Sequence, residues 1–215
     1  MNVGIIGSGT AGRALATAFL SEGHSVMLGT RTPTKDEVQK WLKENAGGKA
    51  GTFEETASFG EILVLVTRGD IASKALEMAG TKNLSGKIII DATNPIAKEP
   101  PVNGVLVYFS NINHSLMEDL QSAFPAAKFV KAFNSVGNNL MYKPQLKGGR
   151  PSMFICGNDD GAKKKVTELL TSFGWDTEDM GKVEGARAIE PLCMLWCIPG
   201  MLQNQWNHAF KLLRV

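Results

Sequence analysis

A glycine-rich segment near the start of the chain constrains its fold more than any other feature. It reads Gly7-Ser8-Gly9-Thr10-Ala11-Gly12 and follows a short apolar run, Asn2 to Ile6, that is typical of a buried parallel strand. Apolar residues then recur at helical spacing up to Glu22, and Gly23 is placed to end that helix. In this strand–turn–helix context, the spacing of the glycines predicts a loop that holds the phosphates of a dinucleotide. An ordinary strand-to-helix turn is the alternative interpretation.

Each glycine of this segment has a separate expected purpose. Gly7 permits the tight turn, Gly9 lets the backbone approach a pyrophosphate, and Gly12 permits close packing of the helix on the strand. Free N–H groups at the start of the helix, together with the helix dipole, would face the negative charge. We therefore expect residues 7–12 to bind the pyrophosphate of the cofactor.

Strand and helix patterns alternate along the first two thirds of the chain. Strands are predicted at Ser25 to Leu28, Glu61 to Thr67, Lys87 to Asp91 and Lys128 to Phe133. Helices are predicted over Thr34 to Asn45, Ile71 to Ala79 and Ser115 to Phe124, the first with Thr34 and Glu37 as a capping box. This alternation predicts an α/β fold of the Rossmann type, a doubly wound, mostly parallel sheet with helices on both faces.

The last third adds one more strand–helix unit and then becomes helical. A strand is predicted at Ser152 to Cys156, a helix over Ala162 to Phe173, a short strand near Trp175, and helix from beyond Gly185 to Leu213. We therefore predict a dinucleotide-binding domain over residues 1–150 and a small C-terminal α/β and helical lobe over residues 151–215. Such a lobe would complete the substrate pocket or form a dimer contact.

The residues after the second predicted strand indicate which dinucleotide fits. Enzymes that use NAD place an Asp or Glu about 20 residues beyond the glycine loop, where its carboxylate binds the ribose hydroxyls. This chain has Gly29-Thr30-Arg31-Thr32 there, with no carboxylate. Threonine hydroxyls can donate to a 2′-phosphate, and Arg31 and Lys35 can add charge-assisted hydrogen bonds. We therefore expect Thr30, Arg31, Thr32 and Lys35 to bind NADP(H); a solvated surface arginine is the alternative for Arg31.

Composition and charge argue against several classes of function. A formal net charge of +2 gives no strong field for nucleic acid or an anionic membrane. The apolar stretch Leu192 to Ile198 is too short to span a bilayer, and the predicted strand at Asn2 leaves no place for a signal peptide. The cysteines, Cys156, Cys193 and Cys197, show no metal-ligand spacing. We expect no metal site, no nucleic-acid or membrane partner, and a reducing cytoplasm.

Four further motifs follow the glycine loop in a specific order. They are Gly29-Thr30-Arg31 with Lys35, Asp91-Ala92-Thr93-Asn94-Pro95, Lys131-Ala132-Phe133-Asn134 and Cys156-Gly157-Asn158-Asp159. With these motifs the chain resembles, over nearly its whole length, the NADP oxidoreductases that use the deazaflavin coenzyme F420. It is also similar to the cytoplasmic domains of the six-transmembrane metalloreductases.

The resemblance implies roles for residues at matching positions. Thr30, Arg31 and Lys35 would clamp the 2′-phosphate, while Thr32 stands where the deazaflavin enzymes tend to place a second arginine. The residues that would line the pyrophosphate and nicotinamide ribose are Thr67 and Arg68, and those that would border the nicotinamide are Asn94, Pro95, Ala132 and Asn134. The family also implies a homodimer, with the apolar segment Pro191 to Phe210 as a dimer contact or a pocket wall. Burial in the core is the alternative for that segment.

No proton-transferring residue can be assigned from the sequence alone. The candidates are His114, Lys131 and Asn134, of which Lys131 is expected to be structural or electrostatic. His208 is expected to lie in the last helix and to be structural or exposed. Hydride transfer between two rings needs alignment rather than an acid. We predict an NADP(H)-dependent oxidoreductase that exchanges hydride with a small flavin-like acceptor, coenzyme F420 or a flavin. The alternatives are a non-catalytic NADP(H) sensor and an imine or ketone reductase.

Overall fold

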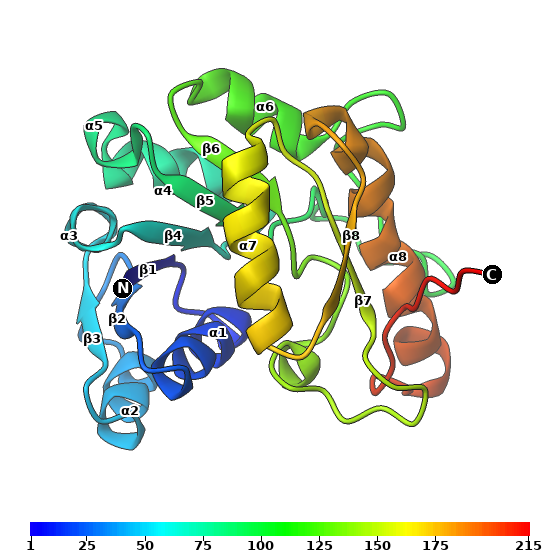
Figure 1. Cartoon of the computed structure of the whole chain (residues 1–215), viewed down its shortest axis with the longest axis horizontal. Coiled ribbons are helices and arrows are strands. Elements are labelled where there is room, and N and C mark those ends of the chain that lie inside the picture. The colour runs from blue at the N-terminus through cyan, green and yellow to red at the C-terminus, as the bar shows by residue number, and fades with distance from the viewer.

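A six-stranded sheet forms the centre of the structure, a computed structural model that describes residues 1–215 (Figure 1). Its strands are β1 (Asn2–Ile6), β2 (Ser25–Gly29), β3 (Lys49–Gly51), β4 (Ile62–Leu65), β5 (Ile88–Asp91) and β6 (Lys128–Lys131). They run in the order β3-β2-β1-β4-β5-β6, and all neighbouring strands are parallel. The strand order reverses between β1 and β4, which is where such sheets bind ligands at the carboxyl ends of the strands. The predicted doubly wound Rossmann fold is confirmed.

Helices cover both faces of the sheet. They are α1 (Thr10–Ser21), α2 (Asp36–Glu44), α3 (Phe53–Phe59), α4 (Ala72–Ala79), α5 (Thr81–Leu84), α6 (Leu116–Ala123), α7 (Asp160–Ser172) and α8 (Ala186–Gln203). Ile5 belongs to a core that α1, α2 and α7 cover, whereas its neighbour Ile6 belongs to a core that α3, α4 and α6 cover. Strands buried on both faces read as continuous apolar runs, which explains the sequence pattern.

The last third of the chain packs on the same core. Its strands β7 (Ser152–Ile155) and β8 (Asp176–Asp179) pair in parallel and are joined by α7, which lies across the front of the sheet in Figure 1. The Lys131 backbone N–H donates to the Cys156 carbonyl at 3.0 Å and so links β6 to the end of β7. Phe173 packs against Phe19 of α1, with ring centroids 4.9 Å apart. One hydrophobic core thus includes residues from both sides of residue 150. The division into two domains at that residue stays a prediction.

The predicted start of α2 is wrong by two residues, and three short elements are missed. The Lys35 N–H donates to the Thr32 carbonyl, so this turn delays the helix until Asp36, and the expected Thr34–Glu37 capping box does not form. A capping box forms instead between Thr52 and Glu55 at the start of α3. The elements β3, α3 and α5 are not evident from the sequence, because three, seven and four residues are too few for a clear period.

The predicted end of the last helix is also wrong. The helix α8 ends at Gln203, because Asn204 adopts the left-handed conformation (φ 55°) that commonly follows a helix. The following residues run beside β7, where the Ser152 N–H donates to the Phe210 carbonyl at 2.8 Å. His208 therefore lies outside the helix, with its ring stacked on Trp196. Although α8 has 18 residues, no helix here is both long enough and apolar enough to cross a membrane.

An ion pair between α6 and α8 predicts a loss of stability in acid. Arg187 donates to Glu118 at 2.5–3.1 Å, and this contact, helped by Ser115, lowers the pKa of Glu118 to about 2. A carboxyl whose pKa is lower in the folded state stabilises the fold above its unfolded pKa, and that contribution disappears as the pH falls towards 2. Glu118→Gln should therefore lower the urea midpoint at pH 7, and the difference from the parent should shrink between pH 5 and pH 2.

The matched control is Glu168→Gln. Glu168 pairs with Lys165 on the exposed surface of α7, where ion pairs contribute little. Its urea midpoint should stay close to that of the parent at every pH. If Glu118→Gln behaves in the same way, the Arg187 contact does not stabilise the fold.

Candidate functional site

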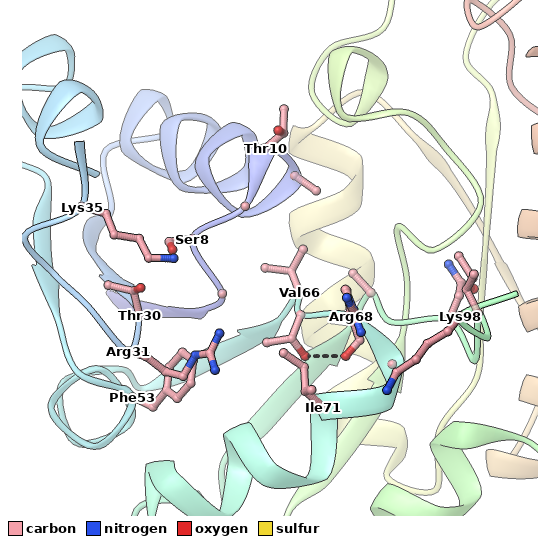
Figure 2. Close-up of a pocket in the computed structure, with 18 of the residues that line it drawn as sticks. Ser8, Thr10, Thr30, Arg31, Lys35, Phe53, Val66, Arg68, Ile71 and Lys98 are labelled. Carbon is pink, nitrogen blue, oxygen red and sulfur yellow. Dashed lines mark hydrogen bonds between the residues drawn. The ribbon is translucent and has the colours of Figure 1, made fainter. Parts of the chain in front are cut away.

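A cavity of about 1070 Å³ opens at the carboxyl ends of β1 to β5 (Figure 2). Its lining comes from the loops that follow these strands: residues 7–11, Thr30, Arg31, Lys35, Phe53, residues 66–69, Ile71, Ala92, Asn94 and residues 96–98. The parallel topology brings these loops together, because every strand ends at the same edge of the sheet. The cavity thus lies at the switch point between β1 and β4.

The glycine loop forms one wall of the cavity. A Cβ on Gly7 (φ 130°) would lie 2.7 Å from the Val66 carbonyl oxygen, and one on Gly12 would lie 2.0 Å from the Gly7 oxygen. A side chain on Gly9 would meet nothing within 4 Å. Gly7 and Gly12 are therefore required by close packing, while Gly9 leaves open space for a bound group. Gly9 also caps α1 without a side-chain hydrogen bond, so the first turn of that helix keeps N–H groups for a ligand.

A second wall follows β2 and carries positive charge. Thr30 is buried, and its hydroxyl accepts from the Thr32 N–H at 3.3 Å, which orders the turn. Arg31 and Lys35 line the cavity and are exposed, whereas Thr32 lies outside the lining. Figure 2 shows both cationic side chains on the same side of the cavity as Ser8. The structure thus brings together three of the four residues predicted for a 2′-phosphate.

The opposite wall follows β4 and β5 and contains part of the predicted nicotinamide site. Thr67, Arg68 and Asn94 line the cavity, while Pro95, Ala132 and Asn134 lie behind it. The Asn94 amide donates to the Asn134 carbonyl at 2.8 Å, and the Asn134 amide donates back to Asn94 Oδ1 at 3.0 Å. Asn134 also donates to the Ile189 carbonyl of α8. The reciprocal bonds fix the orientation of Asn94 and connect it to the C-terminal helix.

Lys131 lies in a fully buried charge cluster beneath this wall. Its ammonium is 2.7 Å from Asp91 Oδ2 and 2.9 Å from Glu190 Oε1, and it donates to the Thr93 carbonyl at 3.0 Å. Burial lowers the pKa of Lys131, but the two carboxylates more than offset this and leave it raised. Its three protons are thus held by protein oxygens. Because Thr93 precedes Asn94, the cluster supports the wall of the cavity from behind.

His114 lies away from the large cavity. It borders a smaller hollow of about 200 Å³ together with Tyr108, Arg187 and Glu190. Its Nε2 is 2.6 Å from Asp119 Oδ1, and this contact raises the pKa of the histidine. Two of the proton-transfer candidates, His114 and Lys131, carry a titratable group. Neither of them lines the large cavity.

Several lining residues were not predicted from the sequence. They are Phe53, Val66, Gly69, Ile71, Ala92, Ile96, Ala97 and Lys98. Phe53 follows the unpredicted strand β3, and Ile96 to Lys98 belong to an irregular segment whose course is set by pairing of Ile96 with Tyr108. Val66 and Ala92 directly follow β4 and β5, so their place at a strand end was the available signal.

The arrangement combines the glycine loop, Arg31 and Lys35 on one side with Ile96, Arg68 and Lys98 towards the other. No His, Cys, Asp, Glu or Tyr lines the cavity, and no group of three or more His, Cys, Asp or Glu in the structure could hold a metal ion. Such a cavity can hold a long anionic ligand with a ring at its apolar end. Its side chains can position such a ligand.

Comparisons with known proteins identify similar NADP oxidoreductases. The family model described as NADP oxidoreductase, coenzyme F420-dependent, matches residues 2–95. A crystal structure of a provisionally assigned F420-dependent NADP-reductase from Arthrobacter sp. FB24 is 34% identical with a TM-score of 0.92, and the match covers 99% of each chain. The F420-dependent NADP reductase of Methanocaldococcus jannaschii is 26% identical, over 91% of this chain and 90% of its own.

Similarity to a larger protein is also evident. Metalloreductase STEAP3 of Rattus norvegicus is 33% identical over 93% of this chain. The matched region makes up 38% of the length of that protein, so this chain spans less than two fifths of it.

Proposed function

Because the chain belongs to the family of coenzyme F420-dependent NADP oxidoreductases, we propose that it transfers hydride between NADP(H) and a flavin-like ring, either the deazaflavin coenzyme or a flavin. The observation that carries this proposal is the composition of the large cavity. Its glycine loop, Arg31 and Lys35 suit a phosphorylated dinucleotide, and its other end carries the apolar side chains of Ile71 and Ile96 and has no His, Cys, Asp, Glu or Tyr.

The residues present fit the proposed cofactor. The open space at Gly9 and the free start of α1 would accept the pyrophosphate, and Arg31, Lys35 and Thr30 would hold the 2′-phosphate. Thr67, Arg68 and Asn94 would border the nicotinamide ribose and ring. When bound, the nicotinamide supplies a hydride, two electrons with a proton, and is oxidised as the acceptor is reduced.

A ring acceptor suits the apolar end better than a ketone or an imine does. Ile71 and Ile96 each expose 37% of their surface there, which a flat ring would cover. Reduction of an imine or a ketone needs a proton donor held beside the substrate. His114 and Lys131 do not reach the cavity, and the lysine at its apolar end, Lys98, is exposed. A flavin is the second acceptor that we propose, because it carries a flat ring of the same kind.

Stopped-flow oxidation of bound NADPH tests the function. The protein is mixed with deazaflavin coenzyme, with free flavin, or with no acceptor, and NADPH absorbance is followed. We expect rapid oxidation by one ring acceptor and none without it. Tight NADPH binding with no oxidation by either ring would instead favour the non-catalytic sensor, or a different substrate.

We also propose that the chain forms a homodimer through its C-terminal part and works in a reducing cytoplasm. Val102, Leu195 and Leu202 expose 64%, 54% and 58% of their surface. A Cβ on Gly104, two residues after Val102, would lie 2.9 Å from Leu202 Cγ, so the loop and the helix are adjacent and can share one apolar surface. Light scattering should give twice the monomer mass, and Leu202→Glu should give the monomer; a monomeric parent contradicts the proposal of a homodimer.

The proposal of a reducing cytoplasm rests on the cysteines. All three are free thiols, which suits a reducing compartment.

A further inference from the structure

The charges that line the large cavity form two separate groups. Four cationic side chains border it and no carboxylate does. Arg31 and Lys35 follow β2, whereas Arg68 and Lys98 follow β4 and β5. Because β2 and β5 are three strand positions apart in the sheet, the carboxyl ends of these two strands are separated by roughly 14 Å at about 4.8 Å per strand. Figure 2 shows Lys98 on the side of the cavity opposite Lys35, with Val66 and Arg68 between them.

The charge of Arg68 is already neutralised, but that of Lys98 is not. Arg68 donates from Nε to Asp70 Oδ1 at 2.9 Å and also contacts Oδ2. The Arg68 hydrogen bonds lower the pKa of Asp70, and the charge of Lys98 adds to this effect, so the ammonium lies near the pair. Lys98 is exposed and forms no ion pair of its own, although the exposed Glu99 follows it in the sequence. This end of the cavity therefore keeps one positive charge in excess.

The cofactor phosphates do not account for that charge. The glycine loop after β1 would take the pyrophosphate, and Arg31 with Lys35 after β2 would take the 2′-phosphate. Lys98 lies beyond both, next to Ile96 and on the same side as Ile71, where the proposed acceptor ring would rest. An unpaired cation beside an apolar platform suits a ligand that joins a flat ring to an anionic tail.

We propose that Lys98 binds a phosphate group carried by the hydride acceptor and so selects phosphorylated over neutral ring acceptors. This inference rests on the proposed function, because it assigns the apolar end of the cavity to the acceptor. It adds to that function a class of substrate and the residue that recognises it. Arg68, held by Asp70, would border the same phosphate and contribute less.

The test compares two flavins that share one ring. Riboflavin has no phosphate, and flavin mononucleotide (FMN) carries one. Binding of each to the NADP⁺-saturated protein is measured by quenching of flavin fluorescence. We expect FMN to bind about tenfold more tightly than riboflavin, the size of effect of one charge-assisted hydrogen bond. Lys98→Met should reduce this ratio to about twofold, on the same scale, while riboflavin and NADPH affinities stay unchanged.

The matched control is Lys164→Met. Lys164 is an exposed lysine of α7 without an ion pair, outside the cavity, so its removal changes net charge by the same amount. This control should keep the full preference for FMN, and raising the salt concentration should weaken that preference in the parent.

Several outcomes would overturn the inference. They are equal affinity of the parent for both flavins, equal losses in Lys98→Met and Lys164→Met, weakened NADPH binding in Lys98→Met, and no binding of either flavin. Because the readout is binding, a preference for FMN without any hydride transfer would contradict the proposed function and leave the phosphate site standing. Hydride transfer to both flavins at equal affinity would support the proposed function and contradict the phosphate site.

Discussion

Replacing Lys131 by methionine should lower the free energy of unfolding by about 3–5 kcal/mol, the usual cost of leaving a buried charge without its partner. Methionine keeps the length of the side chain but removes the ammonium from between Asp91 and Glu190, whose side chains are 0% and 2% exposed. The Thr93 carbonyl loses its donor as well. Urea unfolding followed by far-ultraviolet circular dichroism measures the change.

Lys163→Met is the matched control for this prediction. Lys163 is also largely buried, but its partners Asp160 and Asp179 are 97% and 49% exposed, so water can solvate them after the substitution. We expect a loss of about 1 kcal/mol or less, as for surface ion pairs. Equal losses in the two variants would mean that the buried cluster does not stabilise the fold.

The same cluster shows why the sequence predicts the fold better than it predicts the site. The order of strands and helices follows from periodicity and from Gly7 and Gly12, because the central strands β1, β4, β5 and β6 are buried on both faces and these two glycines have a local steric reason. The partnership of Lys131 with Glu190 joins residues 59 positions apart on a strand and a helix. Local patterns carry no signal for such a contact.

The residues of the candidate site likewise fall into those that the sequence predicts and those that it does not. Residues that directly follow a strand, such as Arg31, Thr67 and Asn94, are predictable because parallel strands end at one edge. Ile96 and Lys98 are not, because an irregular segment places them through pairing of Ile96 with Tyr108. The end of α8 at Gln203 was missed because Asn204 breaks the helix by its backbone conformation, while the residues beyond still read as apolar and helical.

Removal of the Arg31 guanidinium is the change that should affect cofactor binding most. Arg31→Ala should raise the dissociation constant for NADPH by one to two orders of magnitude, corresponding to roughly 1.5–3 kcal/mol for a hydrogen bond to a charged group. Arg31 is exposed at the cavity wall next to Thr30 and has no ion pair within the protein. Its charge is therefore available to the 2′-phosphate, which NADH lacks. Calorimetric titration with both dinucleotides measures the difference.

The preference between the two dinucleotides is the quantity that decides the assignment. NADH affinity should barely change in Arg31→Ala, because the glycine loop and the start of α1 are untouched. Arg150→Ala, which removes an exposed arginine outside the cavity, should leave both affinities as in the parent. If Arg31→Ala weakens NADPH and NADH equally, Arg31 contacts a part that the two cofactors share, such as the adenine. The 2′-phosphate would then have to be held by Lys35 and Thr30, and the preference for NADP(H) would move to those residues.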